Sequence, residues 1–186
     1  MQIPIFKPQT EWTAPTDFPD LSKYDEIAID LETKDPNLNE RMGSGSVIGV
    51  GDVVGISLAT HDWCAYYPIA HEGGGNLDRK MVLKWLQDQM NTNSTKIFHN
   101  AIYDVCWLRR LGIKINGKIV DTMIASAVIN ENRLRYDLNG ICRDYLGKGK
   151  DESALYEAAK SWGVDPKAEM YKLPAMHVGA YAERDA

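Results

Sequence analysis

The stretch YDEIAIDLE, residues 24–32, decides the fold class of this chain of 186 residues. Its residues alternate between two faces, with Ile27 and Ile29 on one and Asp30 on the other, which is typical of a β-strand. Asp30 and Glu32 stand two residues apart, so both side chains leave the same face of this strand. Taken alone, the pair is also typical of solvated acids at the end of a strand.

The pattern outside this strand predicts one α/β domain with a mixed five-stranded sheet flanked by helices, because strands come mainly first and helices later. Residues 1–24, rich in proline, are expected to be an extended lead-in to a domain at 25–186. The further strands are expected at 52–60, 63–70, 95–99 and 117–120, and the helices at 78–90, around Asp104, at 121–132, 136–146 and 176–186, with short helices within 153–162 and 166–172.

The composition is that of a globular protein, with 44% hydrophobic and 25% charged residues. No apolar run approaches the roughly 20 residues that span a bilayer, and no secretory signal is visible. We therefore expect a cytoplasmic protein without a membrane partner. The cysteines at 64, 106 and 142 are odd in number and lie in apolar segments, which favours buried, reduced thiols over a disulfide or a zinc site.

Two more segments carry a carboxylate with a polar residue four positions earlier. Asn100 and Asp104 would share one face of a predicted helix, although Asn100 could merely cap that helix and leave Asp104 exposed. Tyr181 and Asp185 have the same spacing. The alternative interpretation of this pair is structural, with a buried tyrosine beside an exposed aspartate. Three independent segments with such pairs are hard to explain as solvated acids, so we predict that the four carboxylates meet in one cleft.

Four carboxylates gathered in one cleft repel one another unless divalent cations lie between them. Oxygen ligands throughout favour Mg²⁺ or Mn²⁺ over zinc. Such a site in an α/β domain predicts metal-assisted hydrolysis of a phosphodiester. The net charge of −5 argues against a high-affinity DNA-binding module, but it is compatible with an enzyme that grips only the end of a strand.

The three segments resemble the motifs of the DEDD exonuclease superfamily. IAIDLET (27–33) resembles Exo I, HNAIYD (99–104) Exo II and YAERDA (181–186) Exo III. In the third segment a tyrosine stands four residues before the last aspartate, and this spacing resembles the Exo III motif of the DEDDy branch of the superfamily. The segments DTMIASAVIN (121–130) and YDLNGICRDYLG (136–147) are similar to the proofreading domain of family A (Pol I-like) DNA polymerases, most of all phage-encoded members.

This resemblance implies an RNase H-like, DnaQ-like exonuclease fold and removal of nucleotides from the 3′ end of single-stranded DNA with two divalent ions. Asp30 would bridge both ions, Glu32 and Asp185 would ligate the ion that activates the attacking water, and Asp104 would hold the second ion. Tyr181 would orient the water as a further catalytic residue. Asn100 would support the site or the substrate. Independently of the resemblance, Tyr103 is a candidate for stacking on a base of a single-stranded end, because it is next to Asp104 in the sequence, and Thr33 is a further candidate substrate contact.

The chain ends one residue after Asp185, so we expect a truncated C-terminal helix that frays, with weak metal affinity and low activity. A polymerase domain or subunit would then be the partner, in the host cytoplasm if the protein is phage-encoded. Two alternatives remain at this point: an RNA-processing DEDDy exonuclease and a non-catalytic structural module of a polymerase.

Overall fold

A computed structural model describes residues 10–38 and 44–186. Its centre is a five-stranded sheet in the order β3-β2-β1-β4-β5. The β1–β2 and β2–β3 pairs are antiparallel, whereas β1–β4 and β4–β5 are parallel, so the expected mixed sheet is confirmed. The strands are β1 (Glu26–Lys34), β2 (Asp52–Ala59), β3 (Cys64–Pro68), β4 (Thr95–Phe98) and β5 (Ile119–Asp121).

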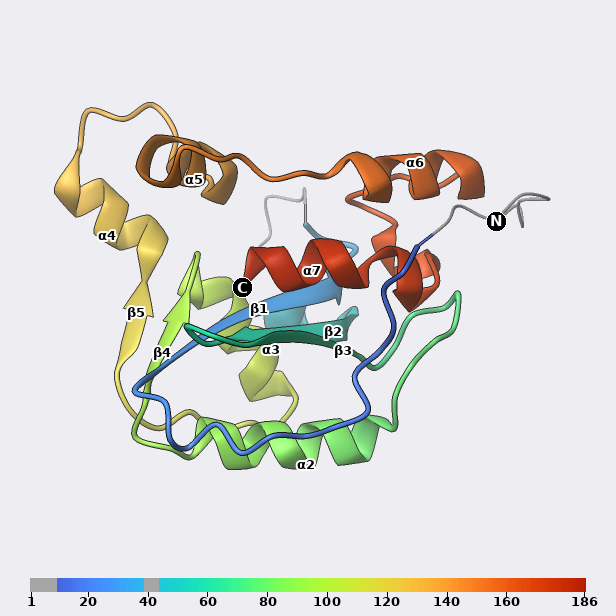
Figure 1. Cartoon of the computed structure of the whole chain (residues 1–186), viewed down its shortest axis with the longest axis horizontal. Helices are drawn as coiled ribbons and strands as arrows, with labels where there is room; N and C mark the ends of the chain where they lie inside the picture. The colour runs from blue at the N-terminus through green and yellow to red at the C-terminus, as the bar shows by residue number, and fades with distance from the viewer. Residues whose placement is uncertain (1–9, 39–43) are drawn as a thin grey trace.

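Helices cover both faces of the sheet (Figure 1), with α7 across one face and α2 on the other side. The N-cap of α2 is Asp78, whose carboxylate accepts the Met81 N–H at 2.8 Å. The helices are α1 (Gly45–Ile48), α2 (Arg79–Met90), α3 (Ala101–Arg110), α4 (Thr122–Ile129), α5 (Leu138–Leu146), α6 (Ser153–Trp162) and α7 (Gly179–Asp185), with 3₁₀ turns η1 (Met170–Lys172) and η2 (Ala175–His177).

The alternation of β1 sends its apolar and acidic residues to different sides of the sheet. Ile27, Ile29 and Leu31 are buried in one core, together with Trp85 of α2. A second, smaller core joins Tyr66 of β3 to residues of α6 and α7 on the opposite face. The acids of β1 therefore lie on the side that α7 covers.

The described part of the lead-in, 10–24, has no regular helix or strand and packs against the domain. Leu21 is buried in the larger core. The Trp12 ring lies so close to α7 that a Cβ at Gly179 would be 2.0 Å from it. Residues 1–9 of the expected lead-in lie outside the described residues.

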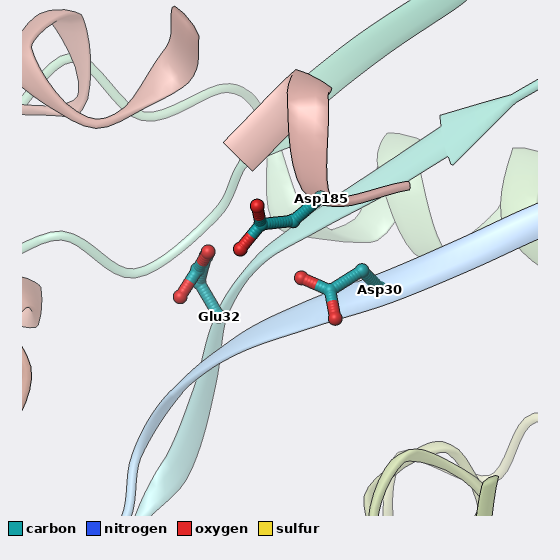
Figure 2. Close-up of side chains that lie close together, drawn as sticks. All are labelled: Asp30, Glu32 and Asp185. Atoms are coloured by element: carbon teal, nitrogen blue, oxygen red, sulfur yellow. The ribbon is translucent and has the colours of Figure 1, made fainter. Parts of the chain in front are cut away.

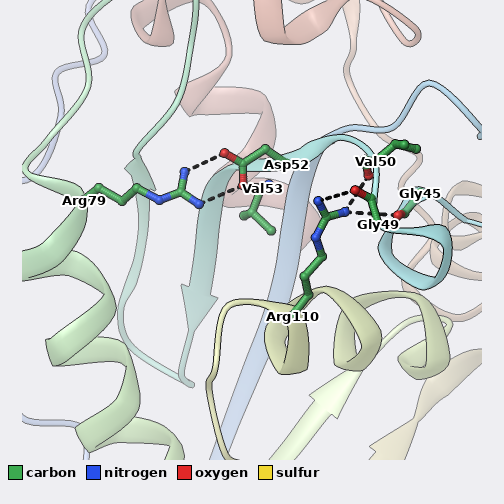
Figure 3. A network of polar contacts seen from close by, with 7 residues as sticks. All are labelled: Gly45, Gly49, Val50, Asp52, Val53, Arg79 and Arg110. Carbon is green, nitrogen blue, oxygen red and sulfur yellow. Dashed lines mark hydrogen bonds and ion pairs between the residues drawn. The ribbon is translucent and has the colours of Figure 1, made fainter.

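The long connection between β1 and β2 contains the short helix α1 and is hydrogen-bonded to α3. Arg110 donates hydrogen bonds to the backbone carbonyls of Gly45, Gly49 and Val50 at 3.1, 2.9 and 2.6 Å (Figure 3). The carbonyls of Gly49 and Val50 lie just beyond the end of α1, where helix carbonyls lack a partner within the helix, whereas the Gly45 carbonyl also accepts the backbone N–H groups of Gly49 and Val50.

The cysteines are free thiols, as expected, but none of the three is buried: Cys106 and Cys142 are partly exposed, and Cys64 is exposed. It is the first residue of β3, whose apolar core residues begin at the next position. Among the described residues, no helix combines the length and the apolar character that a membrane span requires.

Candidate metal centre

β1 presents Asp30 and Glu32 side by side on the face below α7. Across the sheet, Asp30 is opposite Ser57 and Glu32 is opposite Gly55 on β2. The register of β1 shifts directly after Glu32, at the bulge between Glu32 and Thr33. Bulges re-aim side chains next to active sites, and this one follows the second carboxylate of the pair.

The third strand adds a buried tyrosine to the same face. Tyr66 is opposite Ser57 on β2, and its hydroxyl lies 2.7 Å from Nε2 of His71. Burial and the charges of Glu32 and Asp30 raise the pKa of Tyr66 well above its ordinary value, so the phenol stays neutral. The Ser57 hydroxyl is buried next to this row and has no hydrogen-bond partner among the described residues.

The last helix places Asp185 over this row of β1 residues. One ligand atom from each of Asp30, Glu32 and Asp185 lies within 4.8 Å of the others, and Figure 2 shows the three carboxylates turned toward a common point. Two elements far apart in the sequence therefore build one acidic cluster.

Side-chain contacts join the end of α7 to other segments of the chain. Lys150 pairs with Asp185, with Nζ 2.6 Å from Oδ2. Glu183 accepts a hydrogen bond from the Trp12 indole at 2.9 Å and another from the Tyr66 backbone at 3.2 Å. The expectation that this helix frays did not consider the lead-in or the loop after α5, and it stays a prediction.

The fourth acid, Asp104, comes from α3 and is buried, with 3% of its surface exposed. Its carboxylate accepts a hydrogen bond from the Leu31 backbone N–H. That N–H lies beyond the parallel pairing of β1 with β4, which covers only residues 26–28 of β1. Asp104 therefore lies beside the Asp30 end of the cluster.

Asn100 differs from both sequence interpretations. It precedes α3 in a left-handed conformation, with φ of 71°, so it does not share a helix face with Asp104, and its side chain makes no capping hydrogen bond. The cap is Asp121, which accepts the backbone N–H groups of Asn100 and Ala101 at 3.1 and 2.8 Å. Asparagine tolerates this conformation better than most residues.

The electrostatics are those of a site that requires positive charge. Burial, and then the charge of Asp185, raises the pKa of Asp30 to about 7. Burial and the charge of Asp30 raise the pKa of Asp104 to about 8. The pKa of Glu32 is also raised well above its usual range, first by burial and then by its acidic neighbours. Holding all four acids ionised therefore needs a compensating cation.

Asp185 shows that the donor set fits a divalent ion. Its side chain is only 6% exposed, and its Oδ1 is buried without a hydrogen-bond partner among the described residues. A buried carboxylate oxygen without a partner is costly, and a hard cation is a suitable partner for it.

A comparison with known protein families identifies the family of this chain. A family model described as 3′-5′ exonuclease matches residues 11–186. The chain belongs to this exonuclease family. The resemblance to the exonuclease domains of Pol I-like DNA polymerases is thereby confirmed.

The exonuclease relatives are larger proteins from phages and bacteria. The chain is 36% identical to a DNA-directed DNA polymerase of Pseudomonas phage M6, covering 100% of the chain and 29% of that polymerase. It is 28% identical to DNA polymerase I of Pseudomonas aeruginosa, covering 89% of the chain and 17% of that protein. The chain thus spans less than a third of the length of these relatives.

Solved structures confirm the RNase H-like, DnaQ-like fold of the exonuclease chain. Escherichia coli RNase D superposes with a TM-score of 0.56 at 17% identity, covering 89% of this chain and 36% of RNase D. The EXO domain of Aedes aegypti Nibbler gives a TM-score of 0.56 at 18% identity, covering 89% of this chain and 74% of that domain.

Two of the residues expected to contact substrate lie together in this member of the exonuclease family. The hydroxyls of Thr33 and Tyr103 are 2.7 Å apart, and Tyr103 also donates to Asp35 at 3.1 Å. Thr33 follows Glu32 and Tyr103 precedes Asp104 in the sequence, and the Tyr103 ring packs against the larger core.

Sequence reasoning missed three contributors to this exonuclease site. Lys150 lies between the expected helices at 136–146 and within 153–162, and Asp121 is the first residue of an expected helix, without a sign that it also caps α3. Gly55 had no signal beyond its place in a strand, where glycine often marks a close approach.

Proposed function

We propose that the chain is a metal-dependent 3′-5′ exonuclease that removes nucleotides from the 3′ end of DNA, as the proofreading part of a DNA polymerase. The observation that carries this proposal is the acidic cluster of Asp30, Glu32 and Asp185, with ligand atoms within 4.8 Å of one another. Membership in the exonuclease family and similarity to phage and bacterial DNA polymerases support the substrate class.

Two divalent ions, Mg²⁺ or Mn²⁺, would supply the charge stabilisation and the acidified water that phosphodiester hydrolysis needs. Asp30 would help to hold both ions, since its carboxylate interacts with those of Asp185 and Asp104. Glu32 and Asp185 would hold the ion on the side of the attacking water. Asp104 would hold the second ion, on the side of the leaving 3′ oxygen.

Tyr181 would position the attacking water. Its pKa is raised above the ordinary value by burial and by the charges of Glu32 and Asp185. The phenol therefore stays protonated and acts as a hydrogen-bonding group rather than as a base. Attack of the water oxygen on phosphorus forms one P–O bond and breaks the bond to the 3′ oxygen, which leaves with a proton.

The strand end would be held beside the cluster by Thr33, Tyr103 and Asn100. The Tyr103 ring is half-buried and offers a stacking surface for a base. The Asn100 side chain is not used as a helix cap, which leaves its amide available for a polar contact with the nucleotide.

RNA is the competing substrate class, since E. coli RNase D, an exoribonuclease, shares the fold. That similarity concerns the fold alone, at 17% identity, whereas the relatives similar in sequence are DNA polymerases. We therefore favour DNA over RNA. A non-catalytic module is less consistent with a complete set of four acids.

Digestion of 5′-labelled single-stranded DNA and of the matching RNA, with Mg²⁺ or Mn²⁺, tests the proposal. We expect stepwise shortening of the DNA from its 3′ end, and loss of at least about 100-fold in rate for Asp30→Asn, because catalytic ligands contribute on this scale. Asp88→Asn, which removes the same charge from the exposed face of α2, should leave the rate unchanged. Equal cleavage by wild type and Asp30→Asn would refute the mechanism, and faster cleavage of RNA would move the chain to the other substrate class.

A further inference from the structure

Lys150 belongs to none of the three exonuclease motifs, yet it reaches the acidic cluster. It lies in the loop after α5, 35 residues before Asp185, and its side chain is only 16% exposed. The loop is anchored on α5, since the Lys150 backbone N–H donates to Oδ1 of Asn139 at 2.9 Å. A Cβ at Gly149 would be 2.9 Å from the same Asn139 oxygen, so this backbone lies tightly against the helix.

The Lys150 ammonium distinguishes the two oxygens of the Asp185 carboxylate. Nζ is 2.6 Å from Oδ2, while Oδ1 is buried without a hydrogen-bond partner among the described residues. One oxygen is therefore occupied by a protein cation, and the other is left for a different partner.

The same ammonium acts on the rest of the cluster. It lies 5.6 Å from the centre of the Tyr181 ring. Its charge opposes the rise in the pKa values of Asp30 and Glu32. Lys150 is thus the protein's own counter-charge in a site otherwise built from carboxylates.

We propose that Lys150 is a positioning residue for Asp185: it holds Oδ2 and so leaves Oδ1 as the oxygen that a divalent ion takes. The inference rests on the proposed metal-dependent function. Carboxylates that ligate metals are commonly oriented by a hydrogen bond to their other oxygen, and loss of such a partner costs about 10- to 100-fold in metal affinity or activity.

Mn²⁺ binding to the whole chain, followed by electron paramagnetic resonance of the free ion, tests this role without substrate. We expect Lys150→Met to weaken Mn²⁺ binding by about 10- to 100-fold and to raise the Mn²⁺ concentration that gives half-maximal cleavage by a similar factor. Lys150→Arg, which keeps the charge, should lie between wild type and Lys150→Met. Lys148→Met removes the same charge from an exposed residue of the same loop and should bind Mn²⁺ as wild type does.

Unchanged Mn²⁺ affinity in Lys150→Met would overturn the inference, and tighter binding would overturn it too, because the ammonium would then be a competitor of the ion. If Lys150→Met does not fold, the pair Asp185→Asn and Lys150→Met/Asp185→Asn decides, since removing both partners leaves no uncompensated buried charge. A lysine that acts through Asp185 predicts the same weak affinity for these two variants, and different affinities would contradict it. Asp30→Asn distinguishes a failure of the proposed metal site from a failure of the proposed role of Lys150. If Asp30→Asn binds Mn²⁺ like wild type, the metal site itself is wrong. If Asp30→Asn loses Mn²⁺ binding while Lys150→Met keeps it, only the role of Lys150 is wrong.

Discussion

Gly55 makes room for the hydroxyl of Tyr66 within the sheet that carries Asp30 and Glu32 of the acidic cluster. A Cβ at Gly55 would lie 2.0 Å from the Tyr66 hydroxyl oxygen, and the ring is fully buried. Since Gly55 is also opposite Glu32, the tyrosine reaches across β2 toward the acidic cluster only because this position has no side chain.

Gly55→Ala is therefore expected to destabilise the chain by about 1–3 kcal/mol, the usual cost of overpacking a core. For a domain of this size the melting temperature should fall by about 2–12 °C, measured by circular dichroism. Gly140→Ala is the matched control. Gly140 lies in the first turn of α5, and the atom nearest to a Cβ built there would be Oδ2 of Asp137, at 3.3 Å. A Gly55→Ala melting temperature equal to that of wild type would show that Tyr66 can move away freely.

The raised carboxyl pKa values predict a pH dependence of stability in the presence of a chelator. The folded-state pKa values of about 7 for Asp30 and about 8 for Asp104 exceed the unfolded value of about 3.9. Between about pH 4 and pH 8 the folded chain binds more protons, so its free energy of unfolding falls as the pH rises through this window, by at most about 1.4 kcal/mol per pH unit for each group.

Urea denaturation at pH 5, 6, 7 and 8 in EDTA measures this slope. Asp104→Asn should make it shallower, and saturating Mn²⁺ should stabilise the chain most at pH 8, because the ion displaces protons from the cluster. A stability that rises from pH 5 to pH 8 in EDTA would contradict the prediction.

Asp121 caps two helices at once, which predicts an unusually large effect of its removal. It accepts backbone N–H groups of Asn100 and Ala101 at the start of α3, and of Met123 and Ile124 at the start of α4. Asp121→Ala should therefore cost about 1–4 kcal/mol, twice the range for one cap. Urea denaturation should show a smaller loss for Asp137→Ala, whose carboxylate caps α5 alone, and equal losses would argue against a double cap.

The Tyr103 ring is expected to stack on a base of the substrate. Tyr103→Ala should raise the KM for single-stranded DNA by about 5- to 150-fold, which corresponds to the 1–3 kcal/mol per stacked base. Tyr103→Phe keeps the ring and loses only the bonds to Thr33 and Asp35, so its KM should stay close to wild type. Steady-state kinetics on a labelled oligonucleotide check this, and a Tyr103→Phe as impaired as Tyr103→Ala would assign the effect to the hydroxyl.

The sequence alone determined the features that depend on local backbone geometry. Alternation along residues 24–32 predicted β1 with two acids on one face, because successive side chains of a strand point to opposite sides. A spacing of four placed Tyr181 and Asp185 together on α7, because a helix repeats every 3.6 residues. The same spacing failed for Asn100, where the long-range bond to Asp121 selects a left-handed turn instead of a further helical residue.

Only the tertiary structure decided which distant groups meet at the acids. Three contacts join separate segments of the chain: the ion pair of Lys150 with Asp185, the capping of two helices by Asp121, and the packing of the Tyr66 ring against Gly55. No periodic pattern records such contacts, because they depend on how the sheet and α7 pack and on where the loop after α5 returns. Local periodicity determined which carboxylates face the site, and long-range packing determined which charges and hydrogen bonds hold them there.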